Sequence, residues 1–348
     1  MSTVTVQTGW LKDGQFDLSF ILGITGLAFA LAGTALVRPD LFMPLMFADL
    51  WLLGYHHVIA TYTKLVGSRS DRKQNAFLVY VLLPLVLFST FAVGVGAGVF
   101  VIVTVYFFWQ WFHYARQSWG IAQRYRRKAG GLPWDNERLS EVTLWSVPVW
   151  GILSRCHQQS GQFLFMDIWM PQIPLILLNA AGVASAALVA WWVVTRIQAF
   201  RRGELALGHT LFIASHLLVF AVGYGFIENI NVGWLLVNVW HNAQYVTFVW
   251  LYNRQRFAEG IKGDALIVST LSQPGYLRAA GYYVFCILIS TVVYKAMSGV
   301  ADMAFANETG VLTVSQFMIL FAMTLNFHHY VVDGIIWKRK RETGLQKV

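Results

Sequence analysis

The chain has 348 residues, of which 57% are apolar or aromatic and only 12% are charged, and its mean hydropathy is +0.53. Soluble domains are about 25% charged, so this composition excludes a soluble globular protein, and the high hydrophobicity excludes intrinsic disorder. The net charge of +9 does not indicate a nucleic-acid partner, because the basic residues gather at the ends of apolar segments. The sequence predicts an all-α, polytopic integral membrane protein.

Ten apolar segments are long enough to cross a bilayer, which takes about 20 residues per helix. We expect them to form one bundle, a single transmembrane domain over residues 1–348. The predicted spans lie near residues 17–37, 41–64, 75–95, 97–121, 139–157, 173–197, 208–227, 231–256, 276–298 and 313–337. Between the fifth and sixth spans, the amphipathic segment 158–172 is typical of a short interfacial helix.

The placement of Lys and Arg predicts the orientation. Arg38, Arg155 and Lys295 are the only basic residues on the side of the odd-to-even loops. Cytoplasmic loops carry the excess of basic residues, so both termini are predicted to be cytoplasmic, in what we expect to be a bacterial inner (plasma) membrane. The densest cluster, RYRRK at 124–128, suits anionic lipid head groups, and it is also a candidate docking surface for a cytoplasmic electron donor.

Eight of the nine histidines fall in the middle or the inner half of a predicted span. Ionisable side chains in a membrane are costly, and each one is by default a candidate functional group. A shared depth on five helices favours a common metal centre over eight separate structural roles. The ninth, His157, is predicted on the outer side. The eight are His56, His57, His113, His209, His216, His241, His328 and His329.

Neighbouring polar residues extend the predicted centre. His329 and Asp333 are four residues apart and therefore share a helix face, and Gln117, Gln244 and Tyr245 lie on the faces of His113 and His241. The predicted metal ligands are His57, His113, His216, His241, His329 and Asp333. A second group of residues is predicted to bind a second metal ion or to orient the ligands. These residues are His56, His209, His328, Gln117, Gln244 and Tyr245.

Imidazole-rich sites without thiolates suit iron, zinc or copper. One hypothesis is a non-haem centre of one or two iron ions that activates oxygen on a lipid. A second is a haem-binding electron carrier with single histidines as axial ligands, although adjacent histidine pairs are superfluous there. A third is a metal or proton transporter, in which polar groups are expected to cross the whole membrane.

The chain resembles the histidine-rich membrane non-haem iron oxygenases, desaturases and hydroxylases. The shared features are histidines near the inner ends of membrane helices, the doublets His56–His57 and His328–His329, and basic inner loops. The chain is also similar in size and plan to bacterial membrane carotene dioxygenases. The histidine boxes of the desaturases and alkane hydroxylases are absent, so the resemblance implies a reaction class and no particular ligand. It implies oxygen-dependent hydroxylation, desaturation or oxidative cleavage of a lipid or isoprenoid.

Overall fold

A computed structural model describes residues 8–132, 134–305 and 312–337 of the chain. The described residues form two compact units, each built from discontinuous segments. The first unit contains the described residues up to Leu45 together with Phe107–His241, and the second contains Met46–Tyr106 together with the described residues from Asn242 onward. The helices α3, α7 and α11 each contribute residues to both units.

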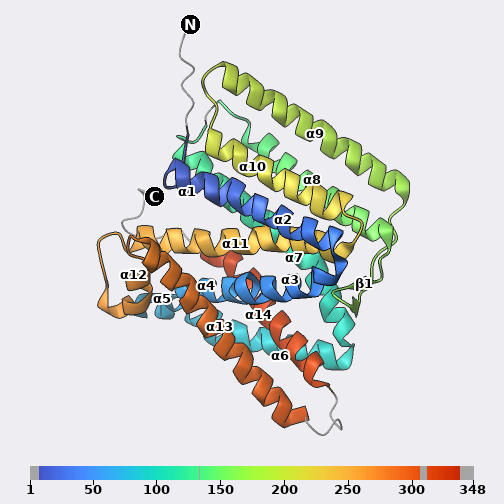
Figure 1. The fold of residues 1–348 in the computed structure, drawn as a ribbon, viewed down its shortest axis with the longest axis vertical. Helices are drawn as coiled ribbons and strands as arrows, with labels where there is room; N and C mark the ends of the chain where they lie inside the picture. Colours follow the sequence, from blue (N-terminus) through green and yellow to red (C-terminus); the bar gives the residue numbers. More distant parts are fainter. Residues whose placement is uncertain (1–7, 133, 306–311, 338–348) are drawn as a thin grey trace. The chain divides into compact units, whose positions relative to one another are not determined.

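The first unit is helical apart from one short hairpin. Its longest helix pair, α8 and α9, packs side by side, and α10 also packs against α8 (Figure 1). The elements are α1 (Gly14–Leu18), η1 (Ser19–Gly23), α2 (Ile24–Val37), η2 (Pro39–Leu41), most of α7 (Val99–Lys128), α8 (Glu137–Gln158), β1 (Gln162–Phe163), β2 (Met166–Asp167), α9 (Leu175–Arg201), α10 (Leu207–Phe220), η5 (Ala221–Phe226) and the first half of α11 (Ile230–Arg256).

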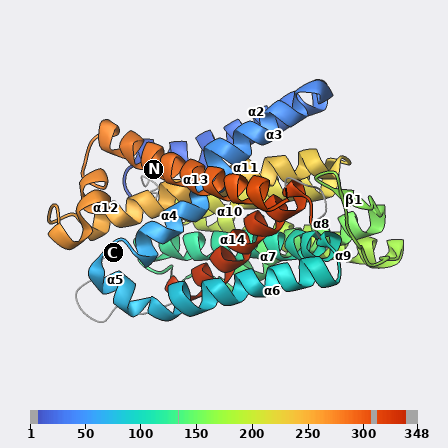
Figure 2. The same ribbon diagram turned by 90° about the horizontal axis from the view of Figure 1, so that it is seen from below.

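In the second unit, α14 packs against α4, α6 and α13 (Figures 1 and 2). Gly94 on α6 lies directly against Leu320 on α14, and a Cβ at Gly94 would clash with that leucine, so this glycine lets the two helices approach closely. The elements are the second half of α3 (Phe42–Asp49), η3 (Leu50–Gly54), α4 (Tyr55–Leu65), α5 (Arg69–Gln74), η4 (Leu78–Leu82), α6 (Leu83–Gly96), the start of α7, the second half of α11, η6 (Gly263–Ala265), α12 (Leu266–Leu271), α13 (Tyr276–Phe305) and α14 (Val314–Ile336).

Each of the ten predicted spans falls mainly within helical segments, and six helical stretches of the described chain are long and apolar enough to cross a membrane. These stretches are Gly14–Val37, Leu78–Gly96, Leu175–Arg201, Leu207–Phe226, Tyr276–Phe305 and Val314–Ile336. In Leu175–Arg201 only 11% of the most apolar window is buried, which is typical of a helix that faces lipid. The six helices indicate a membrane protein.

The other four predicted spans are helical but less apolar. They correspond to residues 42–65, α7, α8 and α11. Charged residues and clustered His, Asn and Gln lower their hydropathy, and many of these polar side chains are buried inside the protein. The count of ten spans therefore stays a prediction.

Four π-helical segments interrupt helices of the described chain, and each contains a carbonyl that accepts a hydrogen bond from a side chain. The hydroxyl of Thr25 donates to Ile21, His57 Nδ1 to Gly54, His328 Nε2 to Leu78, and Arg155 to Gly223. π-Helical turns are rare and often mark functional sites. Because a buried carbonyl needs a partner, each donor stabilises the local change in helical winding.

The prediction of an interfacial helix at 158–172 is wrong, because the segment forms a hairpin. Its strands β1 and β2 are antiparallel, and Phe163 pairs with Met166. Leu164 and Phe165, which connect them, have φ of 49° and 65°, the left-handed conformation that a two-residue turn requires. The Leu164 N–H donates to Asn231 Oδ1 at 2.8 Å, and the buried Phe163 ring packs on Trp234. These tertiary contacts override the helical pattern.

Candidate metal centre

The second unit holds two neighbouring imidazoles, one from each of the sequence doublets. The rings of His57 on α4 and His329 on α14 are 4.8 Å apart between centroids, at an interplanar angle of 77°. Each offers a ring nitrogen, and the two nitrogens lie within 4.8 Å of one another. Both side chains are buried. Two imidazoles at this separation suit the binding of one transition-metal ion.

The orientation of His57 follows from the winding of the helix before it. The π-helical segment η3 ends at Gly54, and the Nδ1–H of His57 donates to the carbonyl of that glycine. With the proton on Nδ1, the lone pair of the neutral ring is on Nε2. A metal-bound histidine usually donates its other N–H in this way, so Nε2 is the candidate ligand atom.

His329 is the end of a chain of buried hydrogen bonds. Its Nδ1 lies 2.8 Å from Thr61 Oγ1, Thr61 Oγ1 lies 2.8 Å from the Tyr245 hydroxyl, and that hydroxyl donates to Asp333 Oδ1 at 2.6 Å. Three contacts need three hydrogens, and the two hydroxyls supply two. With Asp333 ionised, the third comes from Nδ1, so the lone pair of His329 is also on Nε2.

Asp333 lies on the Nδ1 side of His329, with its Oδ1 3.6 Å from that nitrogen. The predicted i, i+4 pairing therefore does place both groups on one face of α14, as the helix register requires. A carboxylate at this position orients the ring and increases its basicity, which is the arrangement found behind many metal-bound histidines. The geometry favours Asp333 as the group that orients the His329 ring over Asp333 as a metal ligand beside His57 and His329.

The first unit holds a second pair of imidazoles. His113 on α7 and His241 on α11 are 5.1 Å apart between ring centroids. Tyr114 stacks on His241 at 3.8 Å, and its hydroxyl donates to Asn238 Oδ1 at 2.5 Å. These side chains are buried. The stacked tyrosine fixes the plane of the His241 ring, and Asn238 in turn fixes the tyrosine.

The remaining predicted histidines have different surroundings. His328 uses both ring nitrogens, one with the Tyr62 hydroxyl at 2.9 Å and one with the Leu78 carbonyl at 2.7 Å, so neither nitrogen is left for a metal. His216 Nε2 donates to the Leu144 carbonyl at 3.0 Å, and its ring packs against aromatic side chains. We interpret both as structural hydrogen-bonding residues.

His56 and His209 complete the set. The His56 ring lies 6.0 Å from that of Tyr283, in an edge-to-face arrangement. His209 is buried in the first unit, and neither of its nitrogens has a hydrogen-bond partner among the described residues. His157, predicted on the outer side, is exposed and bonds through Nδ1 to the Ile173 carbonyl at 2.8 Å.

The amide and hydroxyl side chains near the histidines differ in their hydrogen-bond partners. Gln244 is fully buried and has no hydrogen-bond partner within the described ranges, and the same holds for Gln117 Oε1. The Tyr245 hydroxyl contacts Thr61 and donates to Asp333, and its predicted role in orienting a metal ligand stays a prediction. Sequence reasoning missed Thr61, although it lies four residues after His57 and therefore on the same face of α4.

Comparison with known proteins gives no relative: no family model, curated protein or solved structure matches the chain.

Proposed function

We propose that this protein is a membrane-bound, oxygen-dependent metallo-oxidoreductase that binds iron through two histidine pairs, His57 with His329 and His113 with His241. The observation that carries the proposal is the arrangement of the first pair. Both rings use Nδ1 in hydrogen bonds with protein oxygens, so the lone pair of each neutral ring is on a buried Nε2, the atom proposed to bind the metal.

Neutral imidazoles without thiolates suit iron, with copper, zinc and haem iron as the alternatives. Bound non-haem iron supplies oxygen activation. The residues of the chain hold the ion, orient the rings and keep bulk water away, since all four imidazoles are buried. The proposed substrate is a lipid or isoprenoid, because a buried centre in a membrane protein can receive an apolar chain directly from the bilayer. Hydroxylation, desaturation and oxidative cleavage are the candidate reactions, with a cytoplasmic electron donor where reducing equivalents are needed.

The proposed topology has ten spans with both termini in the cytoplasm of a bacterial inner membrane. It is supported by the asymmetric distribution of Lys and Arg. Cysteine labelling of intact cells tests it. A cysteine introduced at Gly161 should react with an impermeant reagent, and one introduced at Lys128 should not.

The first experiment is elemental analysis and an optical spectrum of the detergent-purified protein. We expect iron at about one or two ions per chain and no Soret band, since the ligands are imidazoles without haem. A Soret band would move the assignment to a haem protein. Freshly prepared protein without tightly bound metal would favour a transporter or a structural histidine cluster.

Single substitutions then test the ligands. His57→Ala, His329→Ala, His113→Ala and His241→Ala should each weaken iron binding at the altered pair at least tenfold, because each removes one of the two imidazoles of that pair. His157→Ala is the matched control and should retain the wild-type iron content, as its side chain is exposed. Full iron retention in all four variants would contradict the assignment.

A further inference from the structure

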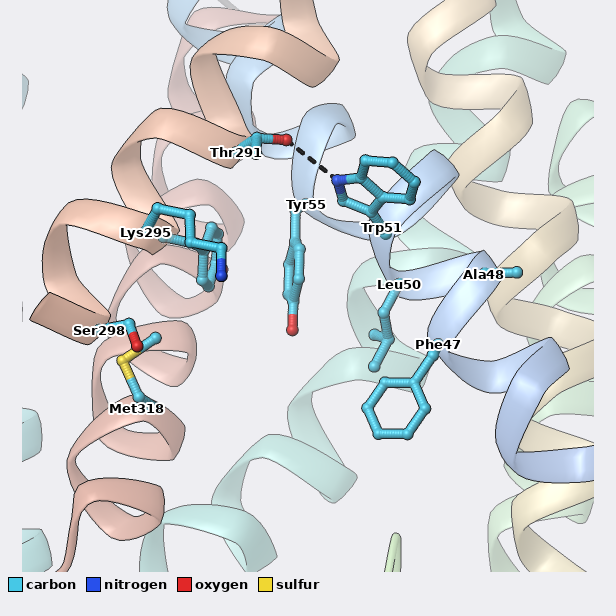
Figure 3. A pocket seen from close by; sticks show the side chains of 10 residues that line it. Phe47, Ala48, Leu50, Trp51, Tyr55, Thr291, Lys295, Ser298 and Met318 are labelled. Atoms are coloured by element: carbon cyan, nitrogen blue, oxygen red, sulfur yellow. Dashed lines mark hydrogen bonds between the residues drawn. The ribbon is translucent and has the colours of Figure 1, made fainter. Parts of the chain in front are cut away.

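A separate cavity of about 440 Å³ lies in the second unit, between the segment containing α3 and η3 and the helices α13 and α14. Its wall is apolar over most of its area and comes from Phe47, Ala48, Leu50, Trp51, Tyr55, Thr291, Tyr294, Lys295, Ser298 and Met318 (Figure 3). Ligand pockets typically measure about 300–1,000 Å³, so this cavity is large enough for one slender molecule.

Three polar groups converge on this apolar cavity. Figure 3 shows Lys295 and Ser298 on one side, Leu50 and Phe47 on the other, and the Tyr55 side chain between them. The ammonium of Lys295 and the hydroxyls of Ser298 and Tyr55 have no hydrogen-bond or ion-pair partner within the described part of the chain. Thr291 differs, because it accepts a hydrogen bond from Trp51 Nε1 at 3.0 Å.

The rigid wall beside these groups is built by aromatic contacts. Tyr55 stacks on Tyr294 with ring centroids 3.9 Å apart, and Tyr294 in turn meets Phe321 edge to face at 5.7 Å. The Trp51–Thr291 bond ties η3 to α13 at one end of the cavity (Figure 3). The cavity is therefore framed by fixed contacts, whereas Phe47 and Trp51 are exposed and offer an apolar approach from the bilayer.

A cation on a membrane helix is costly unless it reaches the interface or pairs with an anion. Lys295 is exposed and lies three residues before the end of the ninth predicted span, so its ammonium can reach the interface and pair there with an anion. A carboxylate placed among the three groups would accept hydrogen bonds from the ammonium and from both hydroxyls. Charge-assisted hydrogen bonds of this kind are the strong ones.

From this complementarity we propose that the cavity binds a single-chain lipid acid, with its carboxylate on Lys295, Tyr55 and Ser298 and its chain along Phe47, Leu50 and Trp51. One cavity of about 440 Å³ suits one chain better than the two chains of a phospholipid. The binding proposal is independent of the iron proposal, because it concerns the metal-free protein and a different set of side chains.

The test is equilibrium binding of radiolabelled palmitate to purified, metal-free full-length protein in neutral detergent. Lys295→Met, which keeps the chain length and removes the charge, should weaken binding at least tenfold, and Lys295→Arg should restore most of it. Tyr55→Phe should weaken binding by a smaller factor. The matched control is Lys73→Met, which removes an exposed charge on α5 and should leave binding unchanged.

Competition distinguishes the head group and the number of chains. Hexadecanol has the same chain and a neutral head, and it should displace palmitate at least tenfold less well than unlabelled palmitate does. Equal displacement by hexadecanol, or unchanged binding in folded Lys295→Met, would overturn the proposal. Displacement by phosphatidylglycerol at the same concentration as palmitate would overturn the single-chain assignment.

Discussion

At the scale of single residues, hydrogen bonds at Nδ1 of His57 and His329 fix the tautomer of each ring in the candidate metal centre. The doublets illustrate this point. Adjacent side chains on a helix diverge by about 100°. In the tenth predicted span, His329 therefore bonds to Thr61, whereas His328 bonds to Tyr62 and Leu78. In this doublet His329 is the proposed ligand, and His328 joins α14 to its neighbours.

The chain Thr61–Tyr245–Asp333 should control metal affinity without touching the metal. Tyr245→Phe removes the hydroxyl that connects Thr61 and Asp333, so the Nδ1–H of His329 loses part of its support. Mutations of such supporting groups typically cost 10–100-fold in metal affinity. We expect the iron dissociation constant, measured by competition with a chelator, to rise by about that factor.

A variant of a bystander tyrosine provides the control for this prediction. Tyr80 is exposed on η4, so Tyr80→Phe should leave the iron affinity unchanged. If Tyr245→Phe also leaves it unchanged while the protein remains folded, the hydrogen-bond chain has no part in metal binding.

At the scale of helices, irregular winding is paired with particular donors. Arg155 is fully buried on α8 and donates to the carbonyls of Gly223, Ile227 and Glu228 at 2.6, 2.5 and 3.0 Å. These carbonyls belong to η5 and to the turn that follows it. The planar guanidinium reaches all three at once, which a lysine ammonium on a flexible stem does not do well.

Arg155→Met should therefore destabilise the protein strongly. It leaves three carbonyls without their charged donor, and hydrogen bonds to charged groups contribute about 1.5–3 kcal/mol each, so we expect a loss of roughly 3 kcal/mol or more. The stability of the Arg155→Lys variant should lie between those of the Arg155→Met variant and the wild type. The measurement is thermal unfolding in detergent, followed by tryptophan fluorescence. Equal melting temperatures for Met and wild type would show that water or other groups replace the arginine.

The helices themselves could be predicted from the sequence, but their irregularities could not. Apolar runs predicted helical segments because a membrane-spanning backbone must satisfy its own hydrogen bonds. The π-helical segments η4 and η5 accept hydrogen bonds from donors far away in the sequence, His328 and Arg155, and the hairpin at 162–167 is held by Asn231. In the candidate site, histidine spacing placed His329 and Asp333 on one face, whereas the pairing of His57 with His329 depends on how α4 packs against α14. No local pattern carries that information.

At the scale of the whole molecule, metal binding should contribute to stability, because buried imidazoles from different helices bind a metal only when the chain is folded. Removing iron with a chelator should lower the melting temperature, and adding iron back should restore it. A ligand present at about 1,000 times its dissociation constant stabilises the native state by about 4 kcal/mol. His157→Ala should respond as the wild type does. An unchanged melting temperature after complete iron removal would contradict a metal centre that joins helices.

The discontinuous composition of the two units has a consequence for biosynthesis. The first unit has all of its segments once synthesis has passed His241, and its pair His113–His241 can form from then on. The second unit needs α14, so the pair His57–His329 is completed only near the end of translation. A ribosome stalled before α14 would expose a chain that holds one histidine pair and lacks the other, with the buried faces of α4 and α6 open to quality-control proteases.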